Sequence, residues 1–187
     1  MHEIDERHRL RDAPRSRQRT PRLAPYQLDV VGAHVADVVD SAGGWLFDRV
    51  MAGWNVRVAV SEPGDLAALQ ILGVQTVSLA SVFGATPAPA ALAVAGSICS
   101  ADGRISEALA ASVRSARTEV TVWGDLWVPS VGRPGDEVRH ELSSAARVFK
   151  AQAAFAAGLD PAVAAYEVFR SYGQSITTEY PDLQPVG

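Results

Sequence analysis

The chain has 187 residues, 48% of them hydrophobic and 20% charged, and its formal net charge at pH 7 is −4. These totals predict one compact domain with a sizeable core and short appendages, and the acidic balance argues against a nucleic-acid-binding domain. The lone cysteine, Cys99, excludes an internal disulfide and a cysteine-based zinc site, and no apolar run reaches the roughly 18 residues that span a membrane.

The first part of the chain, residues 1–25, is an arginine-rich arm whose charge is opposite to that of the whole. Residues 1–22 hold seven arginines against four acids, a local charge of +3. The prolines and the scarcity of apolar residues predict a disordered arm. Because acids interrupt the basic run and no aromatic residue is interleaved, a solvated tail is favoured over a contact with nucleic acid or an acidic partner. The charged start is unlike a signal peptide, so a cytoplasmic location without membrane contact is expected.

After residue 25, short apolar runs alternate with stretches of helical periodicity. We expect strands at residues 27–31, 55–60, 74–79, 91–97 and 119–123, and helices at residues 35–52, 66–72 and 105–117. This alternation predicts a Rossmann-like, doubly wound α/β domain over residues 26–132, with a mostly parallel five-stranded sheet. Residues 81–90 are short and broken by prolines for a parallel crossover, so a bare loop or an unusual connection is expected there.

Beyond residue 132 the pattern predicts helices alone. The apolar residues of the first stretch fall on one helix face, namely Val138, Leu142, Ala145, Phe149 and Ala153. That helix is expected over residues 136–157, and a second one starts at a cap-then-proline pair and runs to about residue 172. We therefore expect a helical hairpin within residues 133–175, followed by a tail at 176–187. Its alanine-rich helices are a candidate surface for a homo-oligomer or a protein partner, and covering the domain's own sheet is the equal alternative.

Ligands of a parallel sheet bind beyond the carboxyl ends of its strands. The residues that follow the expected strands are therefore candidates for lining a ligand pocket, namely Glu62, Ser97, Cys99, Asp125 and Trp127. Glu62 ends a strand as the ribose-binding acid of a dinucleotide fold does, but the G-x-G-x-x-G that should precede it is absent. No histidine near Cys99 is evident as a base, so a small buried thiol is favoured over a nucleophile.

The most specific motif lies at the start of the first expected helix. The sequence reads AHVADV at residues 33–38, then Gly43-Gly44, then AGWNV at residues 52–56. In this order and spacing, residues 28–80 resemble the start of the PIG-L/LmbE family of zinc-dependent N-acetylglucosaminyl deacetylases, in which A-H-P-D-D-E follows the first strand. The resemblance implies a deacetylase-like fold and, if the protein is active, hydrolysis of an N-acetyl sugar amide with zinc as cofactor.

The resemblance assigns zinc binding to His34 and Asp37, which can converge on one cation because they lie three positions apart at a strand-to-helix turn. The general base of the family falls on Ala36, which accepts no proton, and the third ligand falls near Glu107, where the family has histidine. Catalytic zinc requires three ligands, an open position and a base that manages the proton. A catalytically degenerate member is therefore the favoured hypothesis.

Structural explanations of the same residues stay open. His34 fits a strand-end histidine bonded to the backbone, and Asp37 fits a first-turn acid that the helix dipole favours. Gly43 and Gly44 fall in mid-helix, where each glycine costs about 0.5–1 kcal/mol relative to alanine. A close approach of helix to sheet explains them better than phosphate binding does.

Three functional hypotheses follow. In the first, the protein is a non-catalytic relative that acts by binding, for example of a small sugar-like ligand, or by assembly. In the second, it is an active zinc hydrolase with a rearranged site, in which His34, Asp37 and Glu107 hold the metal and Asp40 or Asp102 is the base. In the third, it is a regulatory module that binds a nucleotide or a sugar nucleotide.

Overall fold

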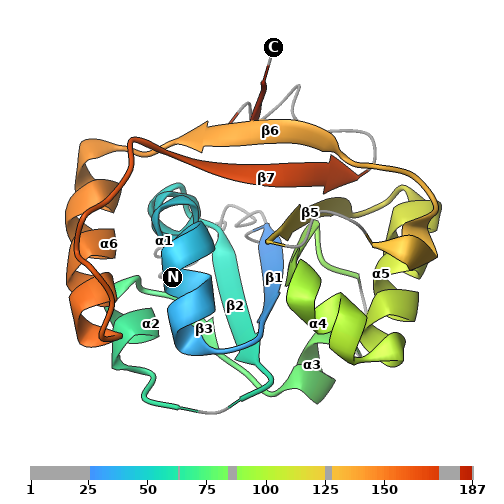
Figure 1. Cartoon of the computed structure of the whole chain (residues 1–187), viewed down its shortest axis with the longest axis horizontal. Helices are drawn as coiled ribbons and strands as arrows, with labels where there is room; N and C mark the ends of the chain where they lie inside the picture. The colour runs from blue at the N-terminus through green and yellow to red at the C-terminus, as the bar shows by residue number, and fades with distance from the viewer. Residues whose placement is uncertain (1–25, 63, 84–87, 125–127, 173–181, 187) are drawn as a thin grey trace, which may run out of the picture.

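The computed structural model describes residues 26–62, 64–83, 88–124, 128–172 and 182–186. It shows one eight-stranded sheet with helices on both of its faces (Figure 1). The arginine-rich arm falls outside the described residues, so its disorder stays a prediction. Among the described helices, none is both long enough and apolar enough to cross a membrane.

Five parallel strands form the larger part of the sheet, which confirms the predicted Rossmann-like α/β class. In their order across the sheet, they are β3 (Gln75–Thr76), β2 (Asn55–Val60), β1 (Gln27–Gly32), β4 (Ala91–Ala95) and β5 (Glu119–Trp123). Every residue of β4 and β5 is buried, as expected of parallel strands covered on both faces. β3 is shorter than predicted, and β4 ends before residue 97 because a helix begins at Gly96.

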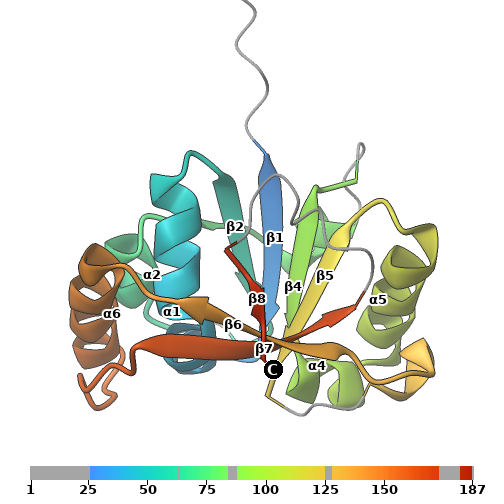
Figure 2. The same cartoon turned by 90° about the horizontal axis from the view of Figure 1, so that it is seen from above.

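Helices cover the two faces of this parallel part. One face carries α1 (Val35–Met51), α2 (Ala67–Ile71) and α6 (Ser144–Ala156), and the other carries α3 (Leu79–Phe83), α4 (Gly96–Ala101) and α5 (Gly103–Ser115) (Figure 2). Each helical layer packs on its own apolar cluster. A single 3-10 turn, η1 (Pro129–Val131), lies against α5 in the described part of the chain.

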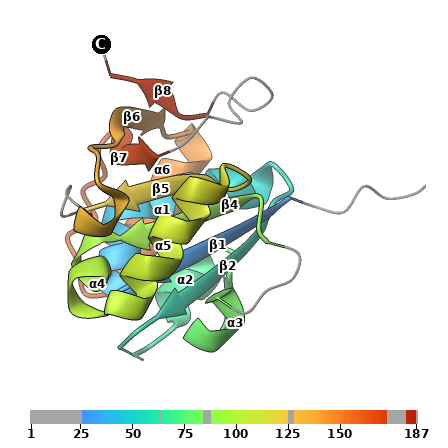
Figure 3. The same ribbon diagram turned by 90° about the vertical axis from the view of Figure 1, so that its right-hand side faces the viewer.

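The last third of the chain is not the predicted helical hairpin. α6 lies between two strands, β6 (Asp136–Glu141) and β7 (Tyr166–Tyr172), and β8 (Gln184–Pro185) follows them. β7 pairs antiparallel with β5, β6 with β7, and β8 with β6, so the sheet has eight strands rather than five (Figure 3). The predicted helix over residues 136–157 is wrong in its first part, and the second predicted helix is wrong.

This error has a physical cause. β6 and β7 bury alternate residues, but two of the buried ones, His140 and Glu167, are polar. The sequence therefore shows no alternation of apolar and polar residues, and the apolar spacing that remains fits a helix. Partners far along the chain make the burial favourable and override local propensity. The end of the chain also joins the domain instead of forming a tail, since Leu183 is buried and β8 pairs with β6.

Helix α1 bends sharply within its length. In Figure 1 one part of it is seen from the side and the other end-on, and in Figure 2 the two parts exchange these views. We call residues 35–43 the first arm and residues 44–51 the second arm. The glycine pair Gly43-Gly44 spans the boundary of the two arms, where the backbone N–H groups of Gly44 and Trp45 donate to the Glu167 carboxylate, and small residues are a common cause of such bends.

Candidate functional site

The first arm of α1 begins directly after β1, at the carboxyl edge of the parallel strands. His34 is exposed and is the N-cap of the helix, because its Nδ1 accepts a hydrogen bond of 3.0 Å from the backbone N–H of Asp37. A capping side chain satisfies one of the unpaired donors at a helix start. One of the two ring nitrogens of His34 is thus bonded to the helix itself.

The carboxylate of Asp37 is bonded on both oxygens to other parts of the fold. Its Oδ2 accepts from the backbone N–H of Ala33 at 3.2 Å, and its Oδ1 accepts from the indole N–H of Trp123 at 3.1 Å. Trp123 is the last residue of β5 and only 1% exposed. Asp37 therefore fastens the loop after β1 to the end of β5. Trp123 was not predicted as a site residue, because its only signal in the sequence is an aromatic residue at a strand end.

Those residues at this edge that the structure describes do not fit a zinc centre. Catalytic zinc needs three protein ligands around one point. Within the described ranges, no three histidine, cysteine, aspartate or glutamate side chains are placed to hold a metal ion. The structure brings His34 and Asp37 together through a backbone N–H, whereas Glu107 is exposed on α5. Ala36 stands at the position of the general base and offers only a methyl group.

Asp40 and Asp102, the two candidate general bases, lie on α1 and at the start of α5. Asp40 is exposed on α1, and its backbone carbonyl, rather than its carboxylate, accepts a hydrogen bond from Lys150. Asp102 is the N-cap of α5 and accepts from the backbone N–H of Arg104 at 2.9 Å. That backbone bond lowers the pKa of Asp102, so this carboxylate is ionised and occupied with capping.

The residues that were expected to line a ligand pocket differ in their exposure to solvent. Glu62 and Ser97 are exposed, whereas Cys99 is buried on α4. Burial raises the pKa of the Cys99 thiol to about 11, so it is a protonated core residue, as predicted, and not a thiolate. Asp125 and Trp127 lie outside the described residues.

The sequence analysis also missed a buried ion pair beside the bend of α1. Lys150 on α6 and Glu167 on β7 are 7% and 5% exposed, and the Lys150 ammonium donates to Glu167 Oε1 at 2.7 Å. Glu167 also accepts from the backbone N–H groups of Gly44 at 2.9 Å and Trp45 at 2.8 Å. The ammonium in turn donates to the Asp40 carbonyl. The pair thus supplies polar partners to the helix backbone on both sides of the bend.

A second buried cluster surrounds Arg49 on the second arm. The guanidinium lies 4.0 Å from the ring centre of Trp54, and its Nη2 donates to Asp182 Oδ1 at 2.9 Å and to Glu119 Oε1 at 3.5 Å. Burial raises the pKa of Glu119, and the charge of Arg49 opposes that rise. This cluster holds the chain segment before β8 against the end of α1.

One polar pocket adjoins the Lys150–Glu167 pair at the carboxyl end of β5. Its volume is about 300 Å³. The residues that line it with polar or aromatic groups are Asp40, Ser41, Trp123, Lys150, Asp160, Tyr166 and Glu167. It shares Trp123 with the bonded group around Asp37, so the two features are neighbours on the same edge of the sheet.

The fold is similar to that of solved deacetylases. A deacetylase solved in complex with teicoplanin, from the biosynthesis pathway of teicoplanin, matches with a TM-score of 0.52 and 14% identity over 80% of this chain and 99% of that chain. The A40926 pseudoaglycone deacetylase Dbv21 matches with a TM-score of 0.49 and 15% identity over 70% of this chain and 80% of that one. No protein-family model matches the sequence, and no curated protein matches it either.

The first of these matches carries the fold assignment. The chain shares the α/β fold of the deacetylase solved with teicoplanin, and this agrees with the deacetylase-like fold that the resemblance of its sequence motif implied. A shared fold at this identity does not assign an activity, because different functions are built on the same scaffold.

Proposed function

We propose that this protein is a non-hydrolytic member of the deacetylase fold that acts by binding or assembly. The bonding of Asp37 is the observation that carries the proposal. Its two oxygens accept from Ala33 and from the buried Trp123, so the residue matched to a zinc ligand has a structural partner for each oxygen. Ala36 beside it can accept no proton from a metal-bound water.

The test is a metal and activity measurement on the full-length, tag-free chain. After incubation with zinc and removal of unbound ions, we expect less than one zinc per chain and no turnover of N-acetylglucosaminyl compounds. The variant Asp37→Ala serves as the matched control, and its zinc content should equal that of the wild type. One zinc per chain together with turnover, both lost in Asp37→Ala, would show an active hydrolase and end the proposal.

We place the binding of a small, hydroxyl-rich molecule in the polar pocket beside Lys150. The accessible carboxylates of Asp40 and Asp160 and the hydroxyl of Ser41 offer donors and acceptors, and the half-exposed Tyr166 adds aromatic surface, as is typical of sites for polar ligands. Titration of the labelled protein with N-acetylglucosamine, followed by amide NMR shifts, should perturb Ser41 and Tyr166 in a saturable way. Titration with ADP is the comparison, and saturable shifts with ADP alone would favour a nucleotide-binding module.

The outer face of α6 supports assembly as the second mode of action. Val148 and Phe155 are 61% and 74% exposed, and their seven-residue spacing puts them on the same side of the helix. We expect a self-associated species in sedimentation velocity that the double variant Val148→Glu/Phe155→Glu converts to monomer. Ala111→Glu, an exposed alanine on α5, is the control. A monomeric wild type at all concentrations would remove assembly through this face.

A further inference from the structure

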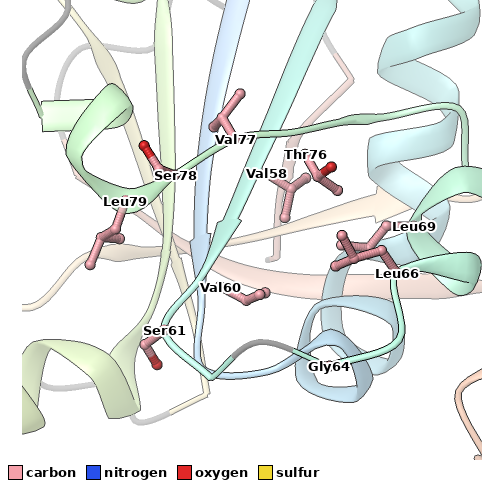
Figure 4. Close-up of a pocket in the computed structure, with 10 residues that line it drawn as sticks. All are labelled: Val58, Val60, Ser61, Gly64, Leu66, Leu69, Thr76, Val77, Ser78 and Leu79. Atoms are coloured by element: carbon pink, nitrogen blue, oxygen red, sulfur yellow. The ribbon is translucent and has the colours of Figure 1, made fainter.

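An apolar pocket lies on the β2–β3 side of the parallel sheet, next to β1, and one of its lining residues, Ser61, donates a hydrogen bond to the Ala33 carbonyl. It occupies about 510 Å³ between the end of β2, helix α2 and the segment that follows β3 (Figure 4). Ten residues line it: Val58, Val60, Ser61, Gly64, Leu66, Leu69, Thr76, Val77, Ser78 and Leu79. It has no lining residue in common with the polar pocket beside Lys150.

The pocket exists because β3 and α2 are both short. β3 pairs with β2 only at Gln75 and Thr76, while β2 continues for two more residues to Val60. After one more hydrogen bond, from the Val77 N–H to the Val58 carbonyl at 2.9 Å, the chain turns into α3. A hollow is left beside the end of β2, in a place where a longer strand and helix would fill the sheet edge.

The lining of this hollow is aliphatic. Six of the ten residues are valine or leucine, three carry a hydroxyl group, and the remaining one is Gly64. None of the ten is charged or aromatic, so the pocket offers neither a counter-ion for a phosphate nor a ring face for stacking a base. Val60, Leu66 and Leu79 are only half-buried, so an apolar ligand would remove more of their surface from water.

The charges next to the pocket narrow the ligand class further. Glu62 and Asp65 are both exposed, and each directly adjoins lining residues in the sequence. Two carboxylates on residues that adjoin the lining disfavour anions such as fatty-acid carboxylates and nucleotides. The lining and its flanks together select a ligand that is aliphatic and uncharged, with a polar end that a hydroxyl group can bind.

We infer that this pocket binds an uncharged aliphatic molecule, with its hydrocarbon chain against the half-buried Val60, Leu66 and Leu79 and its polar end toward Thr76 and Ser78. The size of the pocket lies within the usual range for small-molecule sites, which are mostly apolar with a few placed polar groups. The inference does not rest on the proposed function, because it uses no residue of the Asp37 group and holds whether or not the protein hydrolyses amides.

The experiment is an NMR titration of the isotope-labelled full chain with 1-butanol, 1-hexanol and 1-octanol. We expect saturable amide shifts that are confined to the pocket residues, and a Kd that falls about fourfold for each added methylene that the pocket accommodates. Octanoate, which has the same chain with a negative charge, should bind more weakly than 1-octanol. Equal or tighter binding of octanoate would overturn the assignment of an uncharged ligand.

Charge substitution supplies the matched controls. Thr76 is exposed and lines the pocket, so Thr76→Glu should fold and weaken 1-octanol binding by roughly tenfold or more. Ser78→Glu, a second exposed lining position, should do the same if the first variant is unstable. Gln75→Glu adds the same charge to the same strand outside the pocket and should leave binding unchanged. Shifts that do not saturate, or undiminished binding by both lining variants, would overturn the inference.

Discussion

The first arm of α1 starts at the sheet edge with His34 and Asp37, whose bonded partners are backbone N–H groups, the indole of Trp123 and each other. The second arm lies among buried charges, with Glu167 bonded at its start and Arg49 enclosed near its end. The motif matched to a catalytic site is thus on the arm where Asp37 has neutral partners, whereas the buried ion pairs lie at the bend and along the second arm.

This difference between the arms shows that the C-terminal third of the chain supplies charged partners to α1. Lys150 and Glu167, which bond to α1 around the bend, come from α6 and β7, and Asp182 before β8 reaches Arg49. The ionised groups of the interior therefore attach late segments to an early helix. At the first arm, by contrast, Asp37 joins two strand ends of the parallel part. Carboxylates bond both arms of α1 to the rest of the fold. Removal of a bonded partner should lower the free energy of unfolding by a different amount at each arm.

The largest effect is expected at the buried ion pair. Lys150→Met keeps the aliphatic stem but leaves the Glu167 carboxylate buried without its counter-ion, so the free energy of unfolding should fall by about 3–5 kcal/mol in urea denaturation. Arg147→Met, an exposed neighbour on α6, should change it by less than about 0.5 kcal/mol. Addition of Glu167→Gln should restore part of the loss. Equal losses of unfolding free energy in the two single variants would show that the Lys150–Glu167 pair does not stabilise the fold.

The glycine pair between the arms gives a matched comparison. A Cβ at Gly44 would lie 2.2 Å from Leu142 Cδ2 and 2.6 Å from its Cγ, so Gly44→Ala should cost about 1–3 kcal/mol of unfolding free energy. A Cβ at Gly43 would meet Leu72 Cδ1 at 3.4 Å, an ordinary contact, so Gly43→Ala should be neutral or stabilise by up to about 1 kcal/mol. The close contact is thus at Gly44, against the side chains of Leu142 and Glu167. A larger loss of unfolding free energy for Gly43→Ala than for Gly44→Ala would contradict this.

On the first arm, Asp37→Ala should lower the free energy of unfolding by about 1–2 kcal/mol, because the buried indole N–H of Trp123 loses its acceptor. Asp37→Asn keeps one acceptor oxygen and should lose less. Asp40→Ala, at an exposed position on the same arm, is the control and should be near neutral. Thermal melts of the four proteins measure the order, and a neutral Asp37→Ala would remove the structural role given to this carboxylate.

The smallest effect concerns pH and the second arm. Burial raises the pKa of Glu119 above its usual value of 4.5, so the folded chain retains a proton that the unfolded chain has released. The free energy of unfolding should therefore decrease as pH rises from about 4 through the raised pKa. Glu119→Gln should flatten this part of the curve, whereas Glu107→Gln, at an exposed site, should not. Parallel curves for the wild type and Glu119→Gln would contradict the shift.

The sequence was sufficient for the parallel part of the fold. Apolar strands such as β4, helical periodicity in α1 and turn residues between them are local signals, and they agree with each other. It was not sufficient for β6 and β7, because His140 and Glu167 are buried by partners that only the folded chain supplies. For the same reason the motif placed His34 and Asp37 at one turn but indicated neither the bond from the Asp37 backbone N–H to His34 nor the role of Trp123, which lies 86 residues from Asp37 along the chain.

The role of Asp37 is tested most directly by calorimetric titration with zinc chloride of the tag-free wild type and of Asp37→Ala. The titration shows whether this carboxylate binds zinc or has a structural role alone. If Asp37 belongs to the bonded group with Ala33 and Trp123, neither protein should give a one-to-one binding isotherm, and the two traces should coincide. A one-to-one isotherm in the wild type that is absent from Asp37→Ala would contradict this and establish a metal site at His34 and Asp37.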